Sequence, residues 1–193
     1  MLELKNVTKS FGEKQIFKDF SHSFNTGIYI IKGTSGIGKT TLLRMISGLD
    51  TNFDGEISGG GIQNVSLSFQ EYRLFEHLNA IENVTIIDDI ASNEAKSEAA
   101  LLLDSLGIYG KDQLLYPREM SGGMKLRVSI ARALFKKAPI LLLDEPTREF
   151  NIEHSKMLVE ILKKRAQEQT ILIVTHDSTI ESLCTDAIAF ANG

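Results

Sequence analysis

A glycine-rich segment at residues 33–41 has the composition and spacing of a loop that binds phosphate groups. It reads Gly-Thr-Ser-Gly-Ile-Gly-Lys-Thr-Thr and matches the pattern GxxxxGK[ST]. In such a loop the backbone wraps phosphates closely, the lysine reaches the β- and γ-phosphates, and a hydroxyl coordinates Mg²⁺. The alternative is a plain turn between a strand and a helix. The predicted nucleotide-binding residues are Gly33, Ser35, Gly36, Gly38, Lys39, Thr40 and Thr41, and Thr40 is also a predicted metal ligand.

Two adjacent carboxylates, Asp144 and Glu145, follow the apolar run at residues 140–143. Such a run predicts a strand in the middle of a parallel sheet, and ligands bind outside the carboxyl ends of these strands. Asp144 is placed to hold Mg²⁺, directly or through water, and Glu145 to polarise a water that attacks the γ-phosphate. Alone, Asp-Glu-Pro is equally typical of a surface turn, but a phosphate loop in the same chain favours the catalytic interpretation.

Gln70 and His176 each follow a predicted strand, at residues 65–69 and 170–175. A lone Gln or His is usually a surface or capping residue. Because the phosphate loop and Asp144 also follow strands, we expect all four groups to meet at one edge of a sheet. There Gln70 would contact Mg²⁺ and the attacking water, and His176 would hydrogen-bond the γ-phosphate.

A second candidate anion site lies at Ser121-Gly122-Gly123, where a helix is expected to begin. Ser121 is a favourable N-cap, and the two glycines expose N–H groups at the positive end of the helix. By itself the segment is explained as well by simple capping.

The elements that must position these residues alternate along the chain. Short apolar strands are expected at residues 28–31, 140–143 and 170–175, and helices at 41–48, 94–106, 123–137 and 152–167. Strands are also expected at 55–58 and 65–69, around a turn at Gly59–Gly61. The alternation predicts an α/β P-loop NTPase fold with a mostly parallel central sheet.

We expect a single domain over residues 1–193. Residues 1–70 would form an antiparallel β layer together with the phosphate loop. Residues 71–121 have only helical patterns and would form an inserted helical subdomain, and residues 122–193 would complete the α/β core.

The bulk composition narrows the classes of function. The 193 residues are 42% hydrophobic and carry a net charge of -4, so a nucleic-acid partner is not expected. The single cysteine, Cys184, excludes an intrachain disulfide and fits a reducing compartment. The chain begins without a signal sequence and has no apolar run of membrane-spanning length, which favours a cytosolic protein.

In their order along the chain, the phosphate loop, Gln70, Ser121–Gly123, Asp144-Glu145-Pro146 and His176 resemble the nucleotide-binding domain of ATP-binding cassette (ABC) ATPases. The resemblance implies that ATP and Mg²⁺ are bound in a head-to-tail dimer, with Ser121–Gly123 of one copy closing on the γ-phosphate held by the other. It further implies that Phe11 stacks on adenine. The partners would be the permease subunits of a transporter, contacted at the cytoplasmic face of the membrane through residues 70–78 and the helical subdomain.

The chain departs from the family pattern at two places. The signature commonly reads LSGGQ, but here Met120 replaces its Leu and Met124 its Gln, and Arg148-Glu149-Phe150-Asn151 stands where SALD is usual. An SGGM signature resembles importers of nitrate, sulfonate and taurine-like solutes. The dimer could be a homodimer or pair with a second cassette. The alternative functions are a non-transport ABC ATPase, a binding-only switch and, less in keeping with the motifs, a P-loop small-molecule kinase.

Overall fold

The computed structural model describes residues 1–193 except 63, 88–91, 184–185 and 190–193. Cys184 therefore lies outside the described residues. The strands form two sheets, one antiparallel and one parallel, which confirms the predicted α/β fold with a mostly parallel central sheet and an antiparallel layer.

The antiparallel sheet has the strand order β2-β1-β4. Its strands are β1 (Leu2–Phe11), β2 (Lys14–Phe24) and β4 (Asp54–Gly59). The turn from β1 to β2 passes through Gly12, whose φ of 59° lies in the left-handed region that glycine adopts without strain. This tight turn places Phe11 opposite Lys14 in the register.

The central sheet has five strands in the order β5-β6-β7-β3-β8, and each neighbouring pair is parallel. Its strands are β3 (Gly27–Lys32), β5 (Val65–Ser68), β6 (Ile140–Asp144), β7 (Thr170–Val174) and β8 (Asp186–Ala189). Alternate residues of the middle strands enter two separate cores. In β6, Leu141 and Leu143 join one core while Ile140 and Leu142 join the other. This burial of both faces explains the continuous apolar runs in the sequence.

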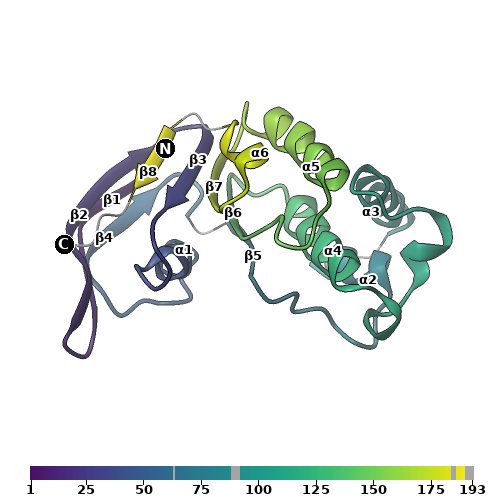
Figure 1. Ribbon diagram of the computed structural model, residues 1–193, viewed down its shortest axis with the longest axis horizontal. Coiled ribbons are helices and arrows are strands. Elements are labelled where there is room, and N and C mark those ends of the chain that lie inside the picture. Colours follow the sequence, from purple (N-terminus) through teal and green to yellow (C-terminus); the bar gives the residue numbers. More distant parts are fainter. Residues whose placement is uncertain (63, 88–91, 184–185, 190–193) are drawn as a thin grey trace.

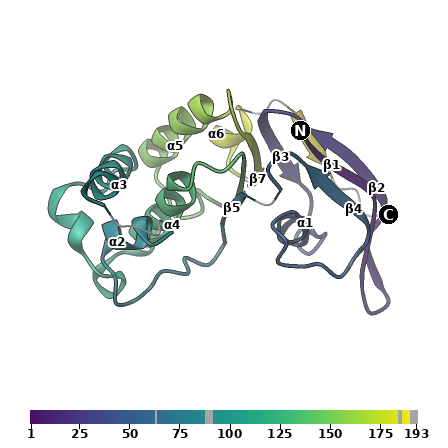
Figure 2. The same cartoon turned by 180° about the vertical axis from the view of Figure 1, so that it is seen from behind.

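Helices cover both faces of the central sheet (Figures 1 and 2). One core contains α1 (Lys39–Ile46) together with the antiparallel sheet. The other contains α2 (Ala80–Thr85), α3 (Asn93–Ser105), α4 (Gly122–Phe135) and α5 (Ile152–Arg165). The remaining short helices are η1 (Gly110–Leu114), η2 (Pro117–Glu119) and α6 (Ser178–Glu181).

One expectation about organisation changes in detail, and one stays a prediction. The strands expected around Gly59–Gly61 both form, but β4 belongs to the antiparallel sheet and β5 to the central sheet. The glycine segment therefore leads from one sheet to the other. Within residues 71–121, the described part holds α2, α3, η1 and η2 and no strand. Because these helices share a core with α4, the boundaries of a separate subdomain stay a prediction.

Candidate nucleotide-binding site

Side chains from distant parts of the sequence line one pocket of about 350 Å³. The phosphate loop follows β3, Gln70 follows β5, Asp144 ends β6 and His176 follows β7. Because these strands are parallel neighbours, their carboxyl ends lie at one edge of the sheet. The predicted residues that line the pocket are Phe11, Ser35, Gly36, Gly38, Lys39, Thr40, Thr41, Gln70, Asp144, Glu145 and His176.

The phosphate loop leads directly into the N-terminus of α1. Gly38 is the N-cap, with φ 113°, and a Cβ at this position would lie 2.3 Å from Ile16 Cγ2. Both the backbone conformation and the close contact therefore require glycine. No side chain caps the helix and its first turn holds no acidic residue, so its positive end faces the loop without internal competition. The buried Lys39 donates through Nζ to the carbonyls of Gly33 (2.6 Å) and Thr34 (3.1 Å), which holds the ammonium over the loop.

Thr40 and Asp144 place two oxygen atoms of the kind that coordinate a metal ion side by side in the pocket lining. Thr40 Oγ1 donates a hydrogen bond of 2.8 Å to Asp144 Oδ2, joining α1 to the end of β6. Asp144 is 4% exposed, and burial raises the pKa of its carboxyl, opposed by the Thr40 hydrogen bond and by the charge of Lys39. A buried carboxylate beside a hydroxyl suits a hard divalent cation, which would offset the cost of burying the charge.

Glu145 lies one residue beyond β6 in a conformation that is rare for a residue with a side chain. Its φ is 51°, and its N–H donates to the carbonyl of Val174 (2.8 Å), which fixes it against β7. Such strain is found at active sites, where the surrounding structure holds the residue in place. Glu145 Oε1 lies 3.6 Å from His176 Nε2. Burial raises the pKa of the Glu145 carboxyl, and the nearby His176 opposes that shift.

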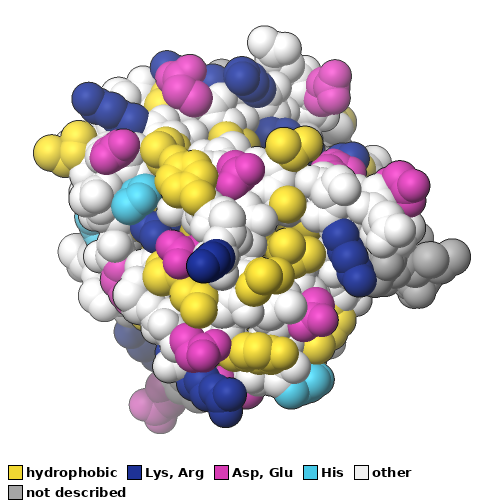
Figure 3. Space-filling view, turned by 90° about the vertical axis from the view of Figure 1, so that its right-hand side faces the viewer, with side chains coloured by type: hydrophobic (Ala, Val, Ile, Leu, Met, Phe, Trp, Pro, Cys, Tyr) yellow, Lys and Arg dark blue, Asp and Glu magenta, His cyan; other side chains and the backbone are white. Residues whose placement is uncertain are grey.

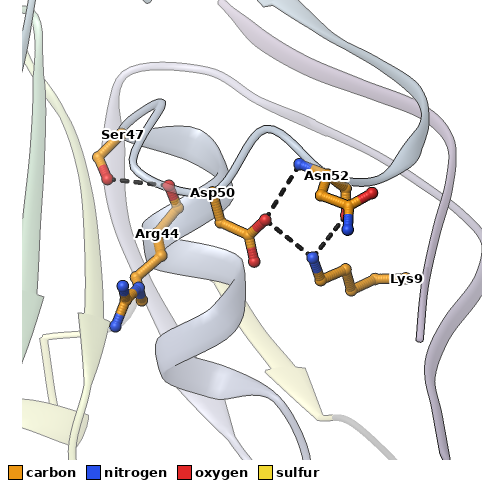
Figure 4. Close-up of polar contacts among 5 residues, drawn as sticks. All are labelled: Lys9, Arg44, Ser47, Asp50 and Asn52. Atoms are coloured by element: carbon orange, nitrogen blue, oxygen red, sulfur yellow. Dashed lines mark hydrogen bonds and ion pairs between the residues drawn. The ribbon is translucent and has the colours of Figure 1, made fainter. Parts of the chain in front are cut away.

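Phe11 ends β1 at the rim of the pocket, and its ring is exposed. The ammonium of the buried Lys9 lies 4.8 Å from the ring centroid. Lys9 Nζ is itself anchored, because it donates to Asp50 Oδ1 (2.8 Å) and to the carbonyl of Asn52, both beyond α1 (Figure 4). This hydrogen bond lowers the pKa of Asp50. The anchored ammonium supports one end of β1 beside the loop, with the Phe11 ring open to a flat ligand.

The structure does not bring every predicted residue to the pocket lining. Gly33 contributes its carbonyl to Lys39 and is not part of the lining. Ser121–Gly123 begin α4, where Ser121 Oγ accepts from the N–H of Met124 (3.2 Å), and they also lie outside the pocket lining. Among the described residues of one chain, therefore, Ser121–Gly123 do not line the pocket that the phosphate loop lines.

Three pocket residues were missed by the sequence reasoning: Lys14, Ile16 and Val174. Lys14 Nζ donates to the carbonyl of Gly36 (3.3 Å), which links the start of β2 to the phosphate loop. Neither motif nor spacing marks these residues. Lys14 and Ile16 reach the pocket through the β1–β2 turn, which carries the start of β2 there together with Phe11, whereas Val174 ends β7.

The fold and the loop at the carboxyl edge of its parallel sheet define a P-loop nucleotide-binding protein. The family model described as ABC transporter matches residues 17–148. The chain belongs to this family, as its ordered motifs predict.

Relatives with known roles extend over nearly the whole chain. The glutamine transport ATP-binding protein of Geobacillus stearothermophilus is 32% identical and matches over 98% of this chain and 86% of its own length. An aliphatic sulfonates import ATP-binding protein of Agrobacterium fabrum is 38% identical, over 97% of this chain and 67% of the relative.

Solved structures agree in fold. The dimeric structure of a bacterial ABC transporter cassette is 28% identical to this chain, with a TM-score of 0.89, over 98% of this chain and 94% of the cassette. The same cassette in a dimeric post-hydrolysis state, bound to ADP and Pi, has a TM-score of 0.88.

Proposed function

We propose that this chain is the ATP-hydrolysing subunit of an ABC transporter and that its substrate is MgATP. The observation that carries the proposal is the meeting of the Lys39 loop, the Thr40–Asp144 pair and Glu145 in one pocket. Membership of the ABC family and the likeness to a cassette bound to ADP and Pi support it.

The phosphate loop and Phe11 account for nucleotide binding. Backbone N–H groups of the loop and the N-terminus of α1 attract the phosphates, and Lys39 supplies a fixed positive charge beside them. The exposed ring of Phe11 offers a stacking surface for the adenine.

Thr40 and Asp144 are the proposed protein ligands of Mg²⁺, with Gln70 beside them in the pocket lining. Among the described residues, no group of three or more His, Cys, Asp and Glu side chains is arranged to hold a metal. A site with few protein ligands suits Mg²⁺, which keeps waters and takes its other ligands from phosphates. When bound, the ion neutralises charge on the β- and γ-phosphates.

Glu145 is the proposed general base. Its carboxylate accepts a hydrogen bond from the attacking water and polarises it as the water approaches the γ-phosphate. His176 is exposed beside it and would donate a hydrogen bond to a γ-phosphate oxygen. Gln70 would orient the same water.

The second anion site completes the pocket from another copy. Ser121 is exposed at the N-terminus of α4, where it is accessible to a second chain. In a head-to-tail dimer, the N–H groups of Gly122 and Gly123 would contact the γ-phosphate bound to the loop of the partner. The dimeric cassette with the same fold supports this arrangement. A second, different cassette could replace the identical copy.

The helical end of the molecule is the proposed contact with permease subunits at the cytoplasmic face of the membrane. Among the described residues, no helix has the length and apolar character to cross a membrane. Hydrophobic side chains gather on this end of the surface (Figure 3). The large exposed hydrophobic residues of this region are Phe75, Ile86, Ile87, Leu101, Tyr109, Leu114 and Tyr116. Exposed apolar side chains in such number favour a protein partner over solvent.

Import of small solutes is the favoured direction of transport. Two of the relatives above are named for glutamine transport and sulfonate import. The chain belongs to the same family, but specificity for the solute would belong to other subunits.

The direct test is phosphate release by the purified chain in the presence of MgATP. We expect turnover that is lost when Mg²⁺ is chelated and that falls by about 100-fold or more in Glu145→Gln, the usual range for general-base catalysis. Glu160→Gln on α5 makes the same change in charge on the exposed surface and should keep wild-type turnover. Normal hydrolysis by Glu145→Gln would refute the general-base role.

A further inference from the structure

Glu149 lies against the N-terminus of α4, at the signature segment Ser121–Gly123. A Cβ built on Gly122 would lie 2.1 Å from Glu149 Oε2, and one on Gly123 would lie 3.0 Å from the Glu149 backbone oxygen. Glu149 therefore packs against the first turn of the helix, with its carboxylate in the space that a side chain at position 122 would take. Its side chain is 33% exposed, so the carboxylate is partly accessible to solvent.

Two neighbours hold the carboxylate in this position through its other oxygen. Glu149 Oε1 accepts a hydrogen bond from the Tyr72 hydroxyl and lies 3.5 Å from Arg148 Nε. The Arg148 guanidinium also lies 5.2 Å from the centroid of the Tyr72 ring. The hydrogen bond to Glu149 raises the pKa of Tyr72, which keeps the phenol protonated as the donor. Oε1 is thus engaged, and Oε2 is directed at Gly122.

The helix end at this point attracts negative charge. Ser121 caps the N–H of Met124, and the N–H of Lys125 bonds to the Ser121 carbonyl. The N–H groups of Gly122 and Gly123 have no acceptor within the helix, as is general for the first turn. A carboxylate and a phosphate are alternative occupants of such a positive end.

We propose that Glu149 occupies the signature helix end of the free protomer and must be displaced before the γ-phosphate of a partner's ATP can bind there. The inference rests on the head-to-tail dimer of the proposed function. Glu149 is then a positioning residue that opposes closure, because displacing it breaks its contacts with Tyr72 and Arg148. Since Tyr72 lies two residues after Gln70, the contact also ties the segment beyond β5 to the signature of the same chain.

The test measures ATP-dependent dimerisation in a Glu145→Gln background, where slow hydrolysis preserves the bound ATP. Adding Glu149→Ala removes the competing carboxylate, and the dimer dissociation constant should fall by about fivefold or more. The ATP affinity of the monomer should stay unchanged, because Glu149 is not part of the pocket lining. Glu149→Gln should have a smaller effect in the same direction, since it loses the charge but keeps the volume. Glu160→Gln is the control for net charge and should have no effect.

Tyr72→Phe separates the proposal from a merely structural role. It removes the hydroxyl that retains Glu149, so it should also tighten the dimer, and it should have no further effect once Glu149→Ala is present. If the contact only supported the fold, Tyr72→Phe and Glu149→Ala would both weaken the dimer instead of tightening it. If Glu149→Ala leaves ATP-dependent dimerisation unchanged or weakens it, the proposed role of Glu149 is refuted, although the proposed dimer is not. If the Glu145→Gln parent itself stays monomeric with ATP, the proposed dimer fails first and the inference with it.

Discussion

The hydroxyl of Thr40 donates a hydrogen bond to Asp144 Oδ2 over 2.8 Å, although the two residues are 104 positions apart in the chain. This contact joins the start of α1 to the end of β6 and so brings together two of the three residues predicted to contact Mg²⁺. It also places a carboxylate in a buried position with a raised pKa, where its charge is costly until a cation arrives.

Asp144→Asn should therefore separate stability from function. Burial raises the pKa of the native carboxyl, so its contribution to stability is fully present below the pKa of the unfolded chain and is lost as pH rises through the folded pKa. At pH 7 the charged Asp144 destabilises the nucleotide-free chain. Asparagine keeps an oxygen for Thr40, and we expect a higher melting temperature at pH 7 by calorimetry, with the difference shrinking near pH ~4. Mg²⁺-dependent hydrolysis should be lost. A lower melting temperature at pH 7 would contradict the buried-charge interpretation.

Lys39→Ala should weaken ATP binding by about 100-fold, because the phosphates lose a fixed cation and its charge-assisted hydrogen bonds. Titration with a fluorescent ATP analogue would measure this. Lys32→Ala is the matched control, since Lys32 pairs with Glu181 and lies outside the pocket lining. Equal affinity of Lys39→Ala and the wild type would refute the phosphate loop.

Phe11→Ala should weaken binding of ATP by about tenfold, the range expected for one base stacked on an aromatic ring. Binding of inorganic triphosphate should not change, because the ring contacts only the base. Ile152→Ala removes another exposed apolar side chain, on α5, and should leave both affinities unchanged. A parallel loss of ATP and triphosphate affinity would indicate that Phe11 supports the loop rather than the base.

The chemistry at the sheet edge could be predicted from the sequence because it depends on local patterns. The loop at residues 33–41 and the Asp144–Glu145 pair each lie next to an apolar strand, and parallel strands bring their ends to one edge. Phe11 entered only through the resemblance to the family. Its support by Lys9, Asp50 and the Asn52 carbonyl depends on the loop beyond α1, and no periodic pattern in the sequence indicates where that loop lies.

The contact between Tyr72, Glu149 and Gly122 could not be predicted from the sequence, for a related reason. Tyr72 and Glu149 are 77 residues apart, and their hydrogen bond follows from how the segments beyond β5 and β6 pack on the start of α4. The sequence marked Glu149 only as a departure from the usual family pattern. It gave no indication of where the carboxylate would lie.

In the proposed dimer, the loop of one copy and the signature of another form a single ATP site. Sedimentation velocity of Glu145→Gln with ATP, with ADP, and with Ser121→Arg added tests it most directly. The arginine would fill the helix end that the γ-phosphate must reach, without touching the pocket that binds ATP in the monomer. We expect a dimer with ATP, a monomer with ADP, and a monomer with normal ATP affinity when Ser121→Arg is present. An ATP-dependent dimer that forms equally well with Ser121→Arg would contradict the proposed shared site.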